Sequence, residues 1–198
     1  GNLDFGKLEY VAQRATFLEG RRALLGVTVE NSKDGLKRFL EETKDLKVEE
    51  LDYRLNEQGI GKAFLGVGMS PGLVEKDDLI ERLGEVGMPA LDLTDSLLAT
   101  QHASSMGSSK TELGNERLLR FEFSEKPGAM QKVLKAIAGE FCITKVHYQN
   151  HSAAVGRLLV GANIPSEEQS RFEAFLKQLH VSYEEETNGI AHKWFSEN

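Results

Sequence analysis

Two stretches of the 198-residue sequence share one pattern: LDYRLNEQGIGKAFLGVG at residues 51–68 and VHYQNHSAAVGRLLVGAN at residues 146–163. In each, an apolar residue precedes a tyrosine by two positions, and a glycine follows that tyrosine by eight. A basic residue, three apolar residues and a further glycine come next. A strand that ends in tyrosine, a polar turn and a second apolar strand predict a β-hairpin. The chain therefore carries one tyrosine-bearing hairpin twice.

The repeat extends well beyond the hairpin. Before each hairpin lie an apolar strand, a polar loop containing a glycine, and apolar positions at helical spacing. The strands are RALLGVTV (22–29) and RLLRFEF (117–123), the loops ENSKDG (30–35) and SEKPG (124–128), and the helical positions Leu36, Phe39, Leu40 and Thr43 or Met130, Val133, Leu134 and Ile137. After each hairpin come a second helical pattern, with Leu79, Leu83 and Val86 or Phe172, Phe175, Leu176 and Leu179 inward, and a short strand, MPALDL (88–93) or VSYEEE (181–186).

Each half of the chain is therefore predicted to run strand, helix, strand, strand, helix, strand. This is the order of the split βαβ, ferredoxin-like arrangement. Right-handed crossovers place both helices on one face of a four-stranded antiparallel sheet. Units of roughly 90 residues lie near the lower limit for a self-sufficient core. We therefore expect an α+β protein with two ferredoxin-like subdomains, at residues 21–99 and 117–198, packed together.

Two segments lie outside the repeats. Within residues 1–20, the apolar positions Leu8, Val11, Ala12 and Ala15 share one helical face, with Gly20 after the expected helix end. We expect a linker helix here that docks on an upstream domain, since the chain begins with Gly rather than Met. Residues 100–116 are rich in Ser and Gly and are expected to connect the two repeats.

Composition excludes several classes of protein. The net charge is −7, and no cluster of Lys and Arg offers a nucleic-acid surface. No apolar run approaches the ~20 residues of a membrane span, and no signal-peptide pattern is present. Cys142 is the single cysteine, which excludes an internal disulfide and a cysteine-based metal site and fits a reducing compartment.

The apparent catalytic motifs are weak. GVGMSPG (66–72) departs from the dinucleotide fingerprint, because position 71 is proline and no helix opens directly after it. His147 and His151 lie across a strand end without a carboxylate at ligand spacing, so no metal site is expected. YEEETN (183–188) is interpreted as a solvated strand end. No Ser or Cys has a recognisable nucleophile context, so no catalytic residue is assigned.

The candidate binding residues are two loops and two tyrosines. The loop after the first strand of each repeat leads into a helix N-terminus, whose free N–H groups and dipole favour a carboxylate. Gly35 and Gly128 allow the chain to turn close to such a ligand. Asp34 and Glu125 lie beside these turns and could accept hydrogen bonds from an ammonium group; a helix cap is the alternative role. Tyr53 and Tyr148 are the remaining candidates, and each offers an apolar wall and one hydroxyl. The alternative is that both are ordinary core tyrosines. Together these groups suit an amino acid.

An ordered set of segments resembles the biosynthetic threonine dehydratase family. NLDFGKLEYVAQRA (2–15) is similar to the segment that closes the catalytic domain of that family. The segments similar to its tandem ACT-like regulatory region are RALLGVTV, LDYR, RFEFSEKPGAM, VHYQNHSAAVGRLLVG and the late ETN. The resemblance covers essentially the whole chain, and its specificity lies in the order of the segments rather than in any one of them.

The resemblance implies a regulatory function. The whole enzyme of that family is a pyridoxal-phosphate (PLP) lyase that converts threonine to 2-oxobutanoate and ammonia at the committed step of isoleucine synthesis. Its regulatory region binds L-isoleucine as inhibitor and L-valine as activator. This chain is then expected to lack lyase activity and to hold no cofactor, with PLP in the missing catalytic domain. A homo-oligomer is implied, in the cytoplasm or, in a plant or alga, the plastid.

The resemblance also implies residue roles. Tyr53 and Tyr148 match the two effector-site tyrosines of the family, and Glu125 lies in its E-x-P-G loop, which is associated with feedback control. The first repeat departs from the pattern, because VENSKDG lacks the usual proline after the first strand. In the second repeat Gln149 stands where Arg is usual, but the E-x-P-G loop is present. The second repeat is therefore the better-supported site.

Two other classes of function stay open on sequence alone. The repeats could hold subunits together through their open sheet faces without binding an effector, and concentration-dependent mass without a ligand response would indicate this. An acylphosphatase-like enzyme shares the fold, but the sequence lacks the Arg and Asn of its phosphate site.

Overall fold

The computed structural model describes residues 22–29, 32–56, 58–69, 76–96, 115–150 and 155–187. The predicted linker helix, most of the connector and the last residues lie outside these ranges. The first repeat contains β1 (Arg22–Val29), α2 (Ser32–Glu42), β2 (Lys47–Leu55), β3 (Gly61–Gly68), α3 (Lys76–Glu85) and β4 (Ala90–Asp92). The second contains β5 (Glu116–Ser124), α5 (Ala129–Glu140), β6 (Cys142–Gln149), β7 (Val155–Asn163), the 3-10 turn η1 (Ser166–Glu168), α6 (Gln169–Gln178) and β8 (Ser182–Glu185).

Both repeats have the predicted order of elements. Within each, the last strand pairs with the first, the first with the third, and the third with the second, all antiparallel. This is the strand order of the ferredoxin-like fold. The prediction of two α+β ferredoxin-like units is confirmed.

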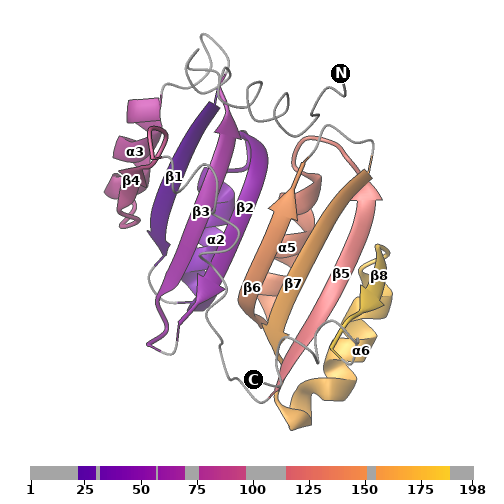
Figure 1. Ribbon diagram of the computed structural model, residues 1–198. Helices are drawn as coiled ribbons and strands as arrows, with labels where there is room; N and C mark the ends of the chain where they lie inside the picture. The colour runs from indigo at the N-terminus through magenta and orange to yellow at the C-terminus, as the bar shows by residue number, and fades with distance from the viewer. Residues whose placement is uncertain are drawn as a thin grey trace, which may run out of the picture.

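The two repeats join edge to edge. Strand β2 pairs antiparallel with β6, so all eight strands form one sheet in the order β4-β1-β3-β2-β6-β7-β5-β8 (Figure 1). Along this seam Leu51 faces Tyr148 and Tyr53 faces Val146. The pairing relates the repeats by an approximate two-fold axis between Asp52 and His147. Both hairpin tyrosines therefore lie on the two central strands.

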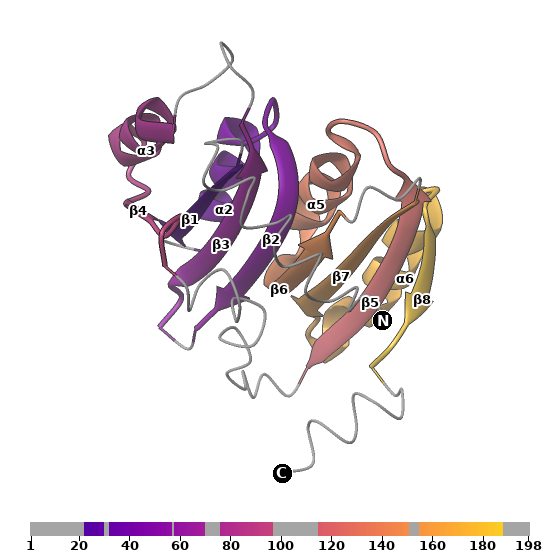
Figure 2. The ribbon, with the colours of Figure 1, turned by 45° about the horizontal axis from the view of Figure 1, so that its top comes forward.

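The helices cover one face of the sheet and leave the other free of helices (Figures 1 and 2). The predicted inward residues of the first and second helical patterns are buried or pack on the core. Helices α2 and α5 contact each other across the seam, where the Gln131 side chain donates to the Thr43 carbonyl at 3.4 Å. Glu41 and Lys135 form an ion pair at the same junction. A single core thus runs under both repeats.

The first strands of the two repeats, β1 and β5, both begin near an arginine, but Arg22 and Arg117 do not hold equivalent positions. The strand register shows that the two differ by one residue. Arg22 pairs with Gly68, whereas Arg117 pairs with Ala162, one position short of Asn163, which is the counterpart of Gly68. Leu24 and Leu118 are therefore equivalent, and Arg117 takes the place of Ala23 on the helix-covered face. The sequence comparison missed this shift because both strands begin with an arginine before their apolar run.

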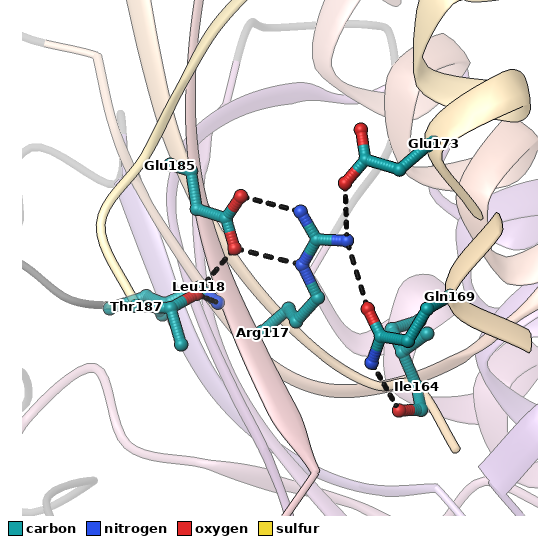
Figure 3. Close-up of polar contacts among 7 residues, drawn as sticks. All are labelled: Arg117, Leu118, Ile164, Gln169, Glu173, Glu185 and Thr187. Atoms are coloured by element: carbon teal, nitrogen blue, oxygen red, sulfur yellow. Dashed lines mark hydrogen bonds and ion pairs between the residues drawn. The ribbon is translucent and has the colours of Figure 1, made fainter. Parts of the chain in front are cut away.

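Arg117 is held among acidic and amide groups on that face (Figure 3). Its Nε donates to Glu185 at 2.8 Å, and its Nη1 lies 2.7 Å from Glu173 and 3.1 Å from the Gln169 oxygen. The guanidinium also lies over the Phe172 ring, 5.0 Å from its centroid. Glu185 is the exposed last residue of β8, in agreement with the interpretation of residues 183–188 as a solvated strand end, and its carboxylate also accepts hydrogen bonds from Arg117, which link β8 to β5.

None of the described helices has the length and apolar character required to cross a membrane. In the same part of the chain, no three His, Cys, Asp or Glu side chains gather closely enough to hold a metal ion.

Candidate functional site

Tyr148 lies at the end of β6 and is 2% exposed. Its hydroxyl is hydrogen-bonded to the Glu125 carboxylate and to the Asn150 side chain. Burial, followed by the bond to Glu125, raises the pKa of Tyr148, so the phenol stays protonated and donates to the carboxylate. The backbone N–H of Asn150 in turn donates to the Glu49 carbonyl at 2.8 Å. The Tyr148 site therefore lies at the seam between the repeats.

Glu125 follows β5 and lies in the loop that leads to α5. Its Oε2 is buried and has no hydrogen-bond partner among the described residues. A buried carboxylate oxygen without a partner is costly, because it has lost its water and gained nothing in return. The oxygen therefore has unused capacity to accept a hydrogen bond, and an ammonium group is the donor that best suits a carboxylate.

Gly128 is the N-terminal cap of α5 and has φ 77° and ψ −2°, as the predicted turn requires. It supplies no side-chain cap to the first turn of the helix. The first N–H groups of α5 thus lack a capping side chain at this position, a few residues after Glu125. A helix start of this kind favours a carboxylate or another anion. The loop thus carries an acceptor for an ammonium group at Glu125 and leads, three residues later, into the helix start that favours a carboxylate.

Replacing Gly128 by alanine should destabilise the protein by about 1 kcal/mol, because an L-residue is strained at this positive φ. A Cβ at this position has open space around it, so the cost comes from the backbone alone. Gly139, an exposed helical glycine in α5, is the matched control. Alanine there should stabilise by about 0.5 kcal/mol. Equal midpoints of chemical unfolding for the two variants would contradict this interpretation of Gly128.

Tyr53 has the same place in the first repeat but different contacts. It is fully buried on β2, and its hydroxyl has no hydrogen-bond partner among the described residues. Burial strongly raises the pKa of Tyr53, so this hydroxyl is neutral. The ring lies against Gly61, where a Cβ would come within 2.5 Å of the Tyr53 Cε2. The two tyrosines are thus both buried, and only that of the second repeat meets a carboxylate.

The first-repeat loop residues lie elsewhere than predicted. Helix α2 begins at Ser32, so Asp34 and Gly35 belong to its first turn and not to the preceding loop. The Asp34 side chain is 80% exposed and lies 4.0 Å from Lys37. The predictions of a turn at Gly35 and of a cap at Asp34 are therefore wrong. They failed because the helical pattern was counted from its first apolar residue, Leu36, whereas the first turn of this helix is polar.

Of the six predicted site residues, the structure brings Glu125 and Tyr148 into contact in the second repeat, and Gly128 follows Glu125 in the same loop. Asn150 also belongs to this group. Sequence reasoning missed it because its neighbours in the hairpin are polar and the pattern does not distinguish them. The glycine eight positions after each tyrosine was visible in the sequence, but its contact with site residues was not.

His147 lies on the helix-free face and not at a metal site. Its Nδ1 is 2.9 Å from the Asp52 carboxylate across the seam. The hydrogen bond to Asp52 raises the pKa of His147. The other histidine of the weak motif, His151, lies outside the described residues.

The sequence was compared with models of protein families and with curated proteins. The model of a family described as the C-terminal regulatory domain of threonine dehydratase matches twice, at residues 13–103 and 107–195. The chain is 33% identical to the L-threonine dehydratase biosynthetic IlvA of Burkholderia multivorans and 32% identical to that of Escherichia coli. It is 30% identical to the mitochondrial threonine dehydratase of Saccharomyces cerevisiae.

Each of these comparisons covers 98% of the chain but only 35% to 38% of the relative. The two matches to the family model correspond to the two repeats seen in the sheet. The remaining length of the relatives has no counterpart here, as expected for a regulatory region without its catalytic part. The chain belongs to the family of threonine dehydratase C-terminal regulatory domains.

Proposed function

We propose that this regulatory domain senses branched-chain amino acids, with L-isoleucine as inhibitor and L-valine as activator of the enzyme to which it belongs. The observation that carries the proposal is the buried Oε2 of Glu125, which has no partner among the described residues and lies beside Tyr148 and the start of α5. The identity of the two effectors rests on the family resemblance.

Each part of an α-amino acid has a partner at this site. The ammonium group takes the free oxygen of Glu125, whose carboxylate Tyr148 positions by its hydrogen bond. The carboxylate is directed to the N–H groups at the start of α5. The apolar side chain packs against Phe123, which lies at the end of β5 on the same face of the sheet as Tyr148.

Opposite responses to isoleucine and valine require more than pocket size. The two differ by one methylene, worth about 0.8 kcal/mol on burial, or roughly a fourfold difference in affinity. Such a small difference cannot reverse the sign of regulation. Each effector must favour a different site or a different conformation. The duplicated tyrosine positions provide the two sites that this scheme needs.

The wider roles follow from the family. We propose that the whole protein is a PLP-dependent lyase acting on threonine, with PLP bound outside this chain, and that it forms a homo-oligomer. Residues 5–18 are the proposed path of coupling to the catalytic part, at about 1–3 kcal/mol. The relatives are assigned to the mitochondrion in yeast and the chloroplast in tomato, so the compartment follows the organism.

The proposal is tested by calorimetric titration with L-isoleucine, L-valine and 3-methylpentanoate, the analogue of isoleucine without its ammonium group. We expect saturable binding of both amino acids and at least tenfold weaker binding of the analogue, since it leaves Glu125 unpaired. Equal affinity for isoleucine and the analogue would show that Glu125 does not receive the ammonium group. Absence of binding in a folded protein would instead favour a structural role in subunit assembly.

A further inference from the structure

The two tyrosines hold equivalent positions in their repeats. Tyr53 pairs with Val146 across the seam and with Ala63 in its hairpin. Tyr148 pairs with Leu51 across the seam and with Leu158 in its hairpin. The backbone therefore gives both side chains the same starting point, and the difference between their contacts must come from neighbouring side chains.

The first difference lies over a glycine. Gly61 is the first residue of β3 and Gly156 the second of β7, and the two hold equivalent positions in their hairpins. In the first repeat the space over Gly61 holds the Tyr53 ring and hydroxyl, at 2.5 and 2.8 Å from the position of a Cβ. In the second repeat the space over Gly156 holds the Phe123 ring, at 2.5 Å, together with Oε2 of Glu125. None of the three atoms nearest to this position belongs to Tyr148.

The second difference explains the first. Gly61 pairs with Val29 on β1, and Gly156 pairs with Phe123 on β5. Valine is too short to cover the glycine, so the Tyr53 ring fills the place. Phenylalanine covers the glycine itself, and two rings cannot occupy one position. Tyr148 is thereby left to bond to Glu125.

An aromatic ring over a strand glycine is a known packing device. Packing alone does not account for the Tyr53 hydroxyl, which is buried with no partner among the described residues, whereas phenylalanine would fill the space without that cost. The cost indicates a second state in which the hydroxyl has a partner. In this structure the Tyr53 ring occupies the place over Gly61.

We propose that the residue facing this glycine, Val29 in the first repeat and Phe123 in the second, sets how readily each site accepts an α-amino acid. The inference rests on the proposed sensing function. Phe123 keeps Tyr148 in the binding arrangement, so the second site binds first. Val29 lets Tyr53 close over Gly61, so the first site binds more weakly, because its ligand must displace the ring.

Two substitutions with opposite expected signs test this inference. Phe123→Val should let the Tyr148 ring move over Gly156 and weaken the tighter isoleucine site about tenfold, the effect of losing one prepared charged hydrogen bond. Gly61→Ala should prevent the Tyr53 ring from closing and strengthen the weaker site by several-fold. Phe64→Val is the matched control, because Phe64 lies on the helix-free face of β3, and it should leave both affinities unchanged.

Calorimetry gives the two affinities, and carbon-13 labelling of the four tyrosines gives the ring signals of Tyr53 and Tyr148. In Phe123→Val the Tyr148 signal should move toward that of Tyr53 in the wild type, a change that general loosening of the core would not produce. If Phe123→Val does not fold, the affinity of the weaker site in Gly61→Ala tests the inference by itself, since it should rise several-fold. Unchanged affinities in both variants would overturn the inference. A wild-type protein that binds no amino acid would overturn the proposed function itself.

Discussion

Replacing Tyr148 by phenylalanine is expected to weaken L-isoleucine binding about tenfold and to lower the free energy of unfolding by about 1 kcal/mol, because Glu125 loses a hydrogen-bond donor. The substitution keeps the buried ring but removes the hydroxyl that holds Glu125 in place. Tyr148→Ala should remove measurable binding and also lower the free energy of unfolding by about 3 kcal/mol, because it leaves a large cavity in the core. Calorimetric titration and chemical unfolding of the two variants separate the two effects.

Tyr183 on β8 provides the control. It is partly buried and its ring lies 6.1 Å from that of Phe121, away from the Glu125 loop. Tyr183→Phe should leave isoleucine affinity as it is in the wild type. If Tyr148→Phe bound isoleucine as tightly as Tyr183→Phe, the bond between Tyr148 and Glu125 would have no part in effector binding.

Arg117→Ala is expected to lower the free energy of unfolding by about 2 kcal/mol. The Arg117 side chain is 10% exposed and connects β5 with Glu185 of β8 and Glu173 of α6. Removing one partner of a buried ion pair costs about 3–5 kcal/mol. The expected value is smaller because Glu185 and Glu173 are 36% and 47% exposed, so water partly compensates them. Chemical unfolding at pH 7 measures the loss.

The matched control is Arg171→Ala. Arg171 is 51% exposed and forms its ion pairs with Glu140 and Glu168 at the surface, so the expected loss is about 0.5 kcal/mol. A loss as large as that of Arg117→Ala would contradict the role given to the buried cluster.

The effect of Arg117 also depends on pH. The hydrogen bond from Arg117 lowers the pKa of Glu185 below its ordinary value of 4.5, so the native state binds this proton less tightly than the unfolded chain. The stabilisation is therefore present above pH 4.5 and is lost as the pH falls through the lowered value. The difference between wild type and Arg117→Ala should narrow below pH 4.5.

Much of the fold follows from the sequence because its signals are local and occur twice. Alternating apolar residues that end in Tyr53 and Tyr148 indicate the strands, and the spacing of residues such as Leu36 and Leu40 indicates the helices. The edge-to-edge seam was not predicted. Strands β2 and β6 carry the same alternation whether their edges are free or paired, so periodicity does not reveal which edge meets another.

The site was predicted in part. The E-x-P-G sequence and the position of Tyr148 indicated the loop and its tyrosine, and Gly128 has the positive φ that the turn requires. The position opposite the hairpin glycine holds Val29 in the first repeat and Phe123 in the second. The sequence did not indicate that these two residues are equivalent, because the first strands are shifted by one residue. Only the strand register reveals that these two residues are equivalent.

Effector binding at Tyr148 is tested most directly by the nuclear magnetic resonance spectrum of the carbon-13-labelled tyrosine rings during titration with L-isoleucine. The Tyr148 ring signal should shift first, at low isoleucine, and the Tyr53 signal should follow only at higher concentration. A Tyr148 signal that stays in place while isoleucine binds, or that shifts only after the Tyr53 signal, would show that the second repeat is not the first to bind.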